Sequence, residues 1–540
     1  MKTKYFLTLP LILLLGVWFT GCVDLDVENP NEPDADLALA AIDNVESLVG
    51  GSYRIYWDAL HYNGFEYPAN TLDVMAWTGS SSWGNFGMLD MGRVSRDPVR
   101  NTEDYTYREA VMESPWYGSY SALSSAIDGM QSVQAGAFDL VPARKARVEA
   151  FARFVMGVVH GWLALYFDQA FIFDETVDLL AVVEGTESLE LQPYNSVYQA
   201  AIDFLDEAIR IAQTGPGFTL PGSWLRGNSD IDNAKLIQLA NTFKARLTAN
   251  LPRTPADRDN VNWQEVLNFL DEGLQETFYI DSVFPSWYDA YRIIAQQPIW
   301  FGGSYYLLGK YDESGNYENW LATSPGSRTS FNIETQDRRI HGPDSLTQRG
   351  KYFANQGGHW FDPARGMYFQ TRYLFQRYCP DETGQVYCGW GMGGTGVHIA
   401  KAELDFLRAE ALFRLDPSGN RDEIVDIINE YRVNIGELPP AETGNSDQEL
   451  WEMITYEKRM ETFATHPGVA YFDARGWPVS SYRQDETFGE SDLPQGTAVH
   501  FPVPVAELHF WEIQSYTTGG IGQDGGAAKN APLIMPLTRD

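Results

Sequence analysis

Apolar residues recur every three or four positions along much of the chain, which is the spacing of one face of an α-helix. In the stretch 148–167, for example, Phe151, Val155 and Val159 share such a face. Comparable stretches fall into two blocks, at about 116–275 and about 399–464. The pattern therefore predicts a mainly α protein.

Capping residues mark several of the helix starts. A Ser, Asp or Asn followed three positions later by Glu or Gln satisfies free N–H groups in a first helical turn. Short turns between the helices indicate helical hairpins, although no strict 34-residue period is present. The signature predicts starts at Asp43 with Glu46, Ser196 with Gln199, Asn262 with Glu265 and Ser446 with Glu449, while Asn233 leads a further helix.

The segment 285–392 between the two blocks is long, Gly-rich and weakly periodic. Irregular segments of this length inside a domain usually carry function, so we expect the ligand region there. Strand candidates are few and short. They are 367–375 and 499–504, and the prolines of the second confine it to a sheet edge.

Aromatic residues concentrate in three irregular segments, 53–91, 284–320 and 352–390. These 115 positions hold 31 of the 74 Phe, Trp and Tyr residues, where a random draw would place about 16. The surrounding residues are Gly, Ser and Asn, and not those of amphipathic helices. The excess is unusual for residues that only build a core.

The faces of a sugar ring carry C–H groups and its edge carries hydroxyls. Such a ring stacks on Trp or Tyr while Asn, Asp, Gln or Arg bind its hydroxyls. Most of these aromatic rings, taken one by one, are expected to pack the interior of the long loops, so the cluster as a whole is the evidence. The candidate ligand-binding residues are Trp77, Trp83, Asn85, Phe86, Trp287, Tyr291, Trp300 and Trp320.

The first 21 residues have the features of an export signal. Lys2 and Lys4 precede an apolar run of about fourteen residues, which is shorter than the roughly 20 that a membrane-spanning helix needs. Residues 19–22 are similar to the lipobox of bacterial lipoproteins, with Phe19 in place of the usual Leu. We therefore expect cleavage before Cys22, lipidation of Cys22 and an acidic tether over 22–35. The alternative is an ordinary cleaved signal followed by an unmodified cysteine.

The other two cysteines, Cys379 and Cys388, enclose turn-forming residues at 380–384. An even pair in an exported chain predicts a disulfide that closes this loop. A zinc site is the weaker alternative, because no second Cys or His pair completes four ligands. We expect neither a metal nor a cofactor.

Acidic residues dominate the charge. The chain has 39 Lys and Arg against 73 Asp and Glu, a formal net charge of −34. Most of such a surface repels a phosphate backbone, so nucleic acid is excluded as a partner.

Several motifs resemble, in order along the chain, those of the SusD/RagB family of nutrient-binding outer-membrane lipoproteins. Each is weak alone, and the ordered set spans nearly the whole mature chain. The sequence departs from the family at Glu457-Lys458-Arg459 and at 465–468. The motifs are Cys22 with its tether, 402–411, 456–461, 471–475 and 501–504 with Glu507.

The resemblance implies a SusD-like domain over 36–540, built on four degenerate tetratricopeptide-like helix pairs. It implies a lipoprotein anchored in the outer membrane, facing the cell exterior. It also implies that the protein captures oligosaccharide and delivers it to a SusC-like TonB-dependent transporter. Peptide capture by the same scaffold is the alternative, since family ligands are commonly glycans and sometimes peptides.

The charged residues of these motifs have a structural interpretation from the residues themselves. Ions on or beside apolar helices need partners, so we interpret the set as a scaffold network and not as catalysts. The set is Arg408, Glu410, Glu457, Arg459, Glu461, Asp473 and Arg475.

A surface glycosidase is the rival from a different functional class. Such an enzyme needs two carboxyl groups at a set separation, and the sequence singles out no pair. Zinc-protease and serine-hydrolase motifs do not occur. The run 391–396 matches G-x-G-x-x-G but lacks a proper preceding strand, so we do not expect a dinucleotide site. The sequence therefore predicts a binding protein and not an enzyme.

Overall fold

The computed structural model of the chain describes residues 41–94, 96, 99–136, 141–227, 230–282, 284–297, 300–358, 365, 368–377 and 394–517. The signal segment 1–21, the tether 22–35 with Cys22, and both Cys379 and Cys388 lie outside these residues. Lipidation and the disulfide therefore stay predictions.

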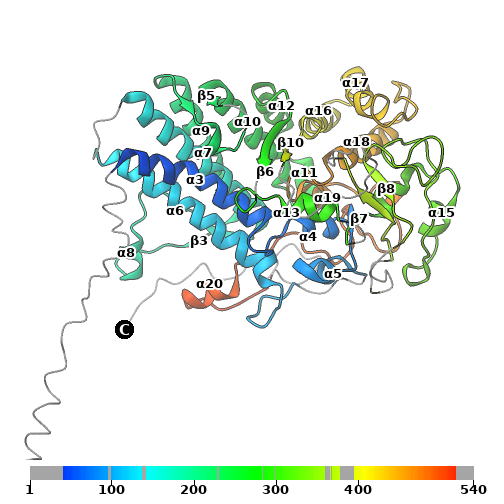
Figure 1. Cartoon of the computed structure of the whole chain (residues 1–540), viewed down its shortest axis with the longest axis horizontal. Helices are drawn as coiled ribbons and strands as arrows, with labels where there is room; N and C mark the ends of the chain where they lie inside the picture. Colours follow the sequence, from blue (N-terminus) through cyan, green and yellow to red (C-terminus); the bar gives the residue numbers. More distant parts are fainter. Residues whose placement is uncertain are drawn as a thin grey trace, which may run out of the picture.

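Nine helices of ten residues or more, among the described residues, form a single curved stack (Figure 1). Each packs on the next: α3 on α6, α6 on α7, α7 on α9, α9 on α10, α10 on α12, α12 on α16, and α16 on α17 and α18. The mainly α fold is confirmed. The helices are α3 (Ile42–His61), α6 (Ser114–Gln134), α7 (Pro142–Tyr166), α9 (Tyr194–Thr214), α10 (Asn233–Asn250), α12 (Trp263–Glu272), α16 (Lys401–Leu415), α17 (Arg421–Arg432) and α18 (Asp447–Thr462).

Shorter helices lie in the connections between the long ones. Several of them contact one another or the stack: α4 packs on α5, α13 and α19, α19 packs on α10, α11 and α18, and α14 packs on α18. They are α4 (Ala69–Met75), α5 (Met88–Gly92), α8 (Leu179–Val183), α11 (Pro255–Asp259), α13 (Ala290–Ala295), α14 (Tyr305–Leu308), α15 (Asn316–Leu321), α19 (Val469–Gly476) and α20 (Val505–Phe510).

The described strands form five two-stranded antiparallel sheets. The pair β6–β10 brings together the two ends of the long segment, so that 285–392 leaves and rejoins the helical stack at one place. The predicted strand 367–375 contains β9, whereas 499–504 makes only one bridge, from Phe501 to Phe167. The pairs are β1 (Gly79–Ser80) with β7 (Gly302–Gly303), β2 (Gln169–Phe171) with β3 (Leu191–Pro193), β4 (Thr219–Leu220) with β5 (Ile231–Asp232), β6 (Phe278–Ser282) with β10 (Gly394–Ile399), and β8 (Phe353–Asn355) with β9 (Tyr373–Phe375).

Two of the predicted caps are confirmed and the others are wrong. Ser446 and Glu449 form a capping box, and Asn262 caps α12. Asp43 and Glu46 do not cap α3, because Glu46 turns to Arg144 and Arg147 of α7. Helix α9 begins before Ser196, whereas α10 begins at Asn233 as predicted, with Asp232 as its N-cap. Ion pairs between helices and the ends of preceding strands thus decide where some helices begin, against the local capping pattern.

Helix α7 is the centre of the stack. It is long and apolar enough to cross a membrane, but 89% of its most apolar 18-residue window is buried inside the protein. Its apolar side chains therefore form part of the protein core. Arg153 and His160 in the middle of the helix predict this, because a membrane-spanning helix rarely carries such residues.

Buried ion pairs join several helices to one another. Arg258 of α11 binds both Glu410 of α16, at 2.7 Å, and Asp473 of α19, at 3.1 Å, and Lys458 of α18 also binds Asp473. None of these four side chains is more than 1% exposed. Burial by itself would raise the pKa of Glu410, but Arg258 and Arg414 hold it below its usual value.

A second buried group surrounds Arg339. Its guanidinium binds Asp337, Glu457 and Glu461 at 2.7, 2.6 and 3.1 Å. Arg475 is fully buried and donates to four backbone carbonyls, and Arg459 binds Asp492. These contacts confirm the scaffold network, with one correction. Arg408 is not part of it, because it faces the half-exposed Asp271 at the surface.

We expect Glu410→Gln to lower the free energy of unfolding by about 3 kcal/mol, because it removes one of the two carboxylates that neutralise the buried Arg258 and one of the two that bind Arg414. Asp271→Asn, which removes the partner of surface Arg408, is the control and should cost less than about 1 kcal/mol. Urea unfolding followed by circular dichroism measures both. Equal losses in the two variants would contradict the assignment of a buried network.

Buried histidines give the fold a dependence on pH. The Nδ1 of His160 lies 2.8 Å from the carbonyl of Met156, and its Nε2 accepts from the N–H of Phe173, so the ring is neutral. Burial lowers the pKa of His160 to about 4. Because the unfolded chain takes up a proton near pH 6.5, His160 stabilises the fold fully above pH 6.5 and loses this contribution as the pH falls toward 4.

We expect His160→Gln to reduce the loss of stability between pH 7 and pH 5 by about 2 kcal/mol, at about 1.4 kcal/mol per pH unit below 6.5. Buried Asp73 and Asp168, whose pKa values burial raises to about 7, act in the opposite direction. The measurement is therefore the difference between the wild type and the variant in urea unfolding at the two pH values. The exposed His509→Gln is the control, and the same slope in all three proteins would refute the prediction.

Candidate functional site

The pairing of β1 with β7 joins two aromatic segments that are far apart in the sequence. Gly79 lies opposite Gly303 and Ser80 opposite Gly302. The Ser80 hydroxyl donates to the carbonyl of Gly302, at 3.2 Å. A Cβ atom on Gly79 would lie 2.2 Å from the ring of Phe301, so the close approach requires glycine.

Two tryptophans meet at the open end of this strand pair. The hydroxyl of Ser81 donates to the carbonyl of Trp300, at 2.6 Å, and accepts from the N–H of Trp83, at 3.1 Å. The two indole rings lie 4.5 Å apart with an angle of 38° between their planes. The ring of Phe86 packs edge-on against the ring of Trp83, with the ring centres 5.7 Å apart. Both tryptophans are half-buried and Asn85 is exposed, and we call Trp83, Asn85 and Trp300 the aromatic platform.

The hydroxyl of Tyr107 lies beside the platform. A Cβ atom on Gly84 would be 3.1 Å from this hydroxyl, so the loop of the platform passes directly over it. Burial and the carboxylate of Asp90 raise the pKa of Tyr107. The phenol therefore stays protonated near neutral pH and can donate a hydrogen bond.

The platform has the properties of a sugar-binding surface. Indole rings are side chains on which pyranose rings stack, and an amide and a phenol such as those of Asn85 and Tyr107 can bind the hydroxyl groups at the edge of a sugar.

The other predicted aromatic residues lie in the core. Trp77 stacks on Tyr306 at 4.9 Å, and the hydroxyl of Tyr291 donates to Asp73. Rings in these positions are enclosed by the protein, whereas Trp83, Asn85 and Trp300 are the members of the predicted set that are half-buried or exposed. The buried members are Trp77, Phe86, Trp287, Tyr291 and Trp320, none more than 5% exposed.

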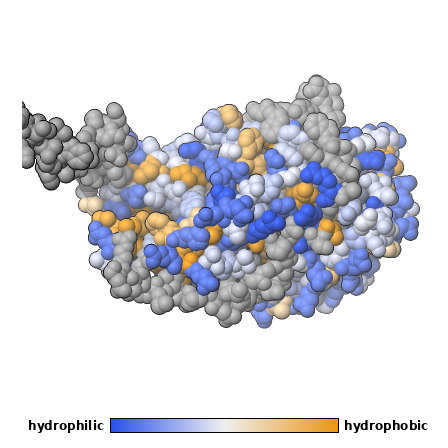
Figure 2. Space-filling view, turned by 90° about the horizontal axis from the view of Figure 1, so that it is seen from below, coloured by the Kyte–Doolittle hydropathy of each residue, from blue (hydrophilic) through white to orange (hydrophobic). Residues whose placement is uncertain are grey.

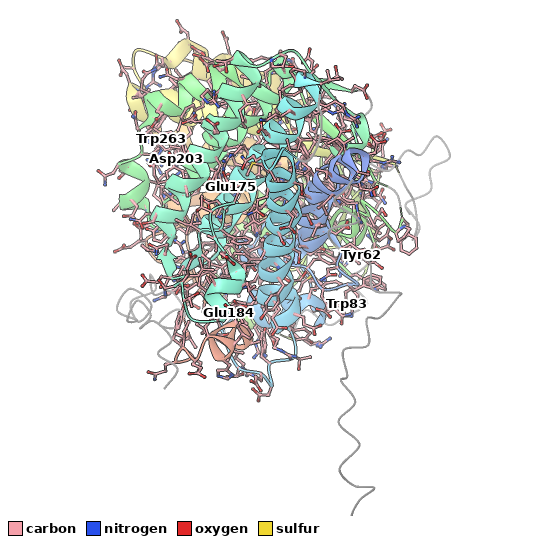
Figure 3. The ribbon with its side chains drawn as sticks, turned by 90° about the vertical axis from the view of Figure 1, so that its left-hand side faces the viewer. Tyr62, Trp83, Glu175, Glu184, Asp203 and Trp263 are labelled. Carbon is pink, nitrogen blue, oxygen red and sulfur yellow. The ribbon has the colours of Figure 1, made fainter. Side chains whose placement is uncertain are left out.

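A second aromatic cluster was not singled out from the sequence. Tyr62 contacts the rings of Phe65, Tyr288 and Phe284 at 5.2, 4.8 and 6.3 Å. Phe65 is 41% and Phe284 56% exposed. Figure 3 places Tyr62 and Trp83 on the same side of the molecule. The signal in the sequence was Asn63-Gly64, a turn-forming pair directly before Phe65, and both Gly64 and Phe65 have a positive φ, of 61° and 73°.

Apolar side chains also gather at the end of the molecule that carries α8 and α20 (Figure 2). Leu180 and Val183 of α8 are 67% and 51% exposed, and Phe510 of α20 is 67% exposed. Exposed apolar groups concentrated at one end are typical of a surface that contacts another molecule.

The acids with the most strongly raised pKa values do not lie on the platform. Burial raises the pKa of Asp73 to about 7 and that of Asp168 to about 7, but Asp73 binds Tyr291 and Asp168 binds Tyr516 in the interior. Within the described residues, no group of three or more His, Cys, Asp or Glu side chains could hold a metal ion.

No protein-family model and no curated protein matches the sequence. Solved structures do match the fold. A SusD-like carbohydrate-binding protein from Bacteroides fragilis is 13% identical with a TM-score of 0.53, and the match covers 81% of this chain and 86% of that one.

Two further matches are surface glycan-binding proteins A. The one from Bacteroides thetaiotaomicron is 13% identical with a TM-score of 0.54, covering 89% of this chain and 99% of that one. The one from Bacteroides uniformis is 14% identical with a TM-score of 0.51, covering 88% and 99%. At this identity the likeness establishes the fold, and the chain has the SusD-like fold.

Proposed function

Starting from the SusD-like fold, we propose that the protein is a surface lipoprotein of the SusD/RagB family that binds oligosaccharide at the aromatic platform. The observation that carries the proposal is the pair of tilted, half-buried tryptophans, Trp83 and Trp300, beside the exposed Asn85. The structures with this fold that are described above as carbohydrate- and glycan-binding proteins support the same ligand class.

We infer that the protein binds its ligand without cleaving it. Glycoside hydrolysis needs an acid with a raised pKa close to the sugar. The candidates with a pKa near 7, Asp73 and Asp168, are only 3% and 6% exposed and are bound to tyrosines. The structures with this fold that are named above are likewise described as binding proteins.

Lipidation of Cys22 would hold the protein at the outer membrane, facing the exterior. There it would deliver the glycan to a SusC-like TonB-dependent transporter. The exposed apolar side chains of α8 and α20 provide a surface on which such a partner could pack. Capture above a transporter would raise the local concentration of the ligand at its entrance.

We expect Trp83→Ala and Trp300→Ala each to weaken glycan binding about tenfold, since a lost aromatic stack is worth about 1 to 1.5 kcal/mol. Affinity electrophoresis against a panel of soluble glycans identifies the ligand, and isothermal titration calorimetry measures the change. Trp511→Ala, a half-buried tryptophan on α20's end of the molecule, is the matched control and should bind as the wild type does.

The same experiment tests the alternatives. Released reducing sugar would overturn the assignment as a binding protein. Binding to a peptide panel with no glycan retarded would favour peptide capture. Wild-type affinity in both platform variants would place the glycan site elsewhere.

We expect Cys22→Ser to move the protein from the membrane fraction to the soluble fraction, because the thioether-linked acyl chains supply the anchoring energy. Cys379→Ser is the control, which leaves the anchor intact. Globomycin treatment of the wild type should block processing of the signal segment. Unchanged fractionation of Cys22→Ser would refute lipidation.

A further inference from the structure

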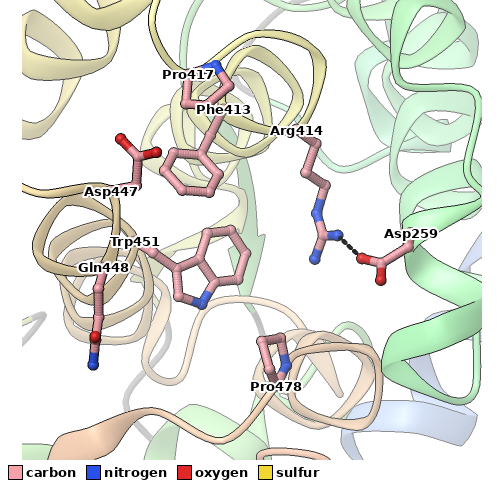
Figure 4. Close-up of a pocket in the computed structure, with 8 residues that line it drawn as sticks. All are labelled: Asp259, Phe413, Arg414, Pro417, Asp447, Gln448, Trp451 and Pro478. Atoms are coloured by element: carbon pink, nitrogen blue, oxygen red, sulfur yellow. Dashed lines mark hydrogen bonds and ion pairs between the residues drawn. The ribbon is translucent and has the colours of Figure 1, made fainter.

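A pocket of about 580 Å³ lies between the ends of four helices (Figure 4). Its walls come from the end of α11, the end of α16, the start of α18 and the turn after α19. The volume is within the range of small-ligand sites. The lining residues are Asp259, Phe413, Arg414, Pro417, Asp447, Gln448, Trp451 and Pro478.

The pocket has an aromatic wall that the core holds in place. The rings of Phe413 and Trp451 lie 5.4 Å apart at an angle of 37°. Fully buried Trp477 meets Trp451 edge-on at 5.8 Å, and the carboxylate of Glu410 fixes Trp477 through its indole N–H. Figure 4 shows Pro417 and Pro478 on either side of this wall. The wall is therefore rigid before any ligand arrives.

Every charged side chain of the lining already has a partner of opposite charge. Arg414 binds Asp259 at 2.7 Å and Glu410 at 2.9 Å. Asp447 binds Arg421. A charged ligand would have to break these pairs, so the pocket favours a neutral ligand.

The rim supplies hydrogen-bonding groups for such a ligand. Asp259 and Asp447 have side chains that are 72% and 54% exposed, and Gln448 is an exposed amide. Carboxylate oxygens accept from hydroxyl groups, and the amide both donates and accepts. The aromatic wall suits the C–H faces of a pyranose ring, and the polar rim, whose charges are paired, suits its hydroxyl groups. The pocket therefore matches a neutral sugar.

We propose that this pocket is a second carbohydrate site, specific for a neutral sugar residue. The ligand class rests on the proposed function, whereas the site does not overlap the aromatic platform. Trp263, whose ring lies 5.1 Å from the Arg414 guanidinium, appears in Figure 3 on the opposite side of the molecule from Trp83. The two sites therefore cannot hold neighbouring residues of one short oligosaccharide.

Isothermal titration calorimetry with the neutral oligosaccharide selected by the panel tests the proposal on four full-length proteins: wild type, Trp83→Ala, Trp451→Ala and the double variant. We expect two binding sites in the wild type, one in each single variant and none in the double variant. Gln448→Ala changes an exposed side chain and leaves the core intact, and it should weaken the affinity of the second site several-fold. It therefore tests the pocket even if Trp451→Ala misfolds.

The outcomes separate the two proposals. If Trp83→Ala abolishes all binding while Trp451→Ala and Gln448→Ala bind as the wild type, the second site is refuted and the proposed function stands. If Trp451→Ala alone removes binding, the pocket is supported and the platform is refuted. If the panel selects only charged glycans, the second site is refuted and the proposed function stands, whereas if the wild type binds no glycan, both are refuted.

Discussion

Arginines and carboxylates that are buried together hold the body of this protein in one arrangement. Arg258 binds Glu410 and Asp473, and Arg339 binds Asp337, Glu457 and Glu461, with none of these side chains more than 1% exposed. A buried ion without its partner is strongly unfavourable, so α11, α16, α18 and α19 can pack in only one register. Helices that contact one another only through apolar side chains can adopt several packing registers, because apolar contacts are less specific.

Both proposed sites depend on this constraint. The pocket at α16 and α18 has Glu410 immediately behind it, where one carboxylate binds Arg258, Arg414 and the indole of Trp477. On the other side, the buried Arg483 reaches the carbonyl of Ala76, just after α4, and so secures the segment that leads to β1 and the platform. Arg258, Arg414 and Arg483 thus attach the irregular segments around both proposed sites to the packed helices.

Much of the fold was predictable because it depends on local pattern. The two helical blocks, the caps at Asn262 and Ser446, and the buried character of α7 all follow from periodicity and from residues within one turn of each other. The failures share a physical cause. Glu46 has the spacing of a capping partner but binds Arg144 and Arg147 instead, about 100 residues away, because two arginines that bind one carboxylate outcompete a single exposed cap.

The sequence by itself determined that the chain is mainly helical, that its surface is acidic and that its aromatic residues concentrate in the segments between helices. Only the tertiary structure decided which of those rings face solvent. Trp77 and Trp83 are six residues apart in similar Gly-Ser surroundings, yet one is 1% exposed and the other half-buried beside Trp300. The difference comes from the pairing of β1 with β7, a contact across 222 residues, and burial set by contacts so distant leaves no local pattern in the sequence.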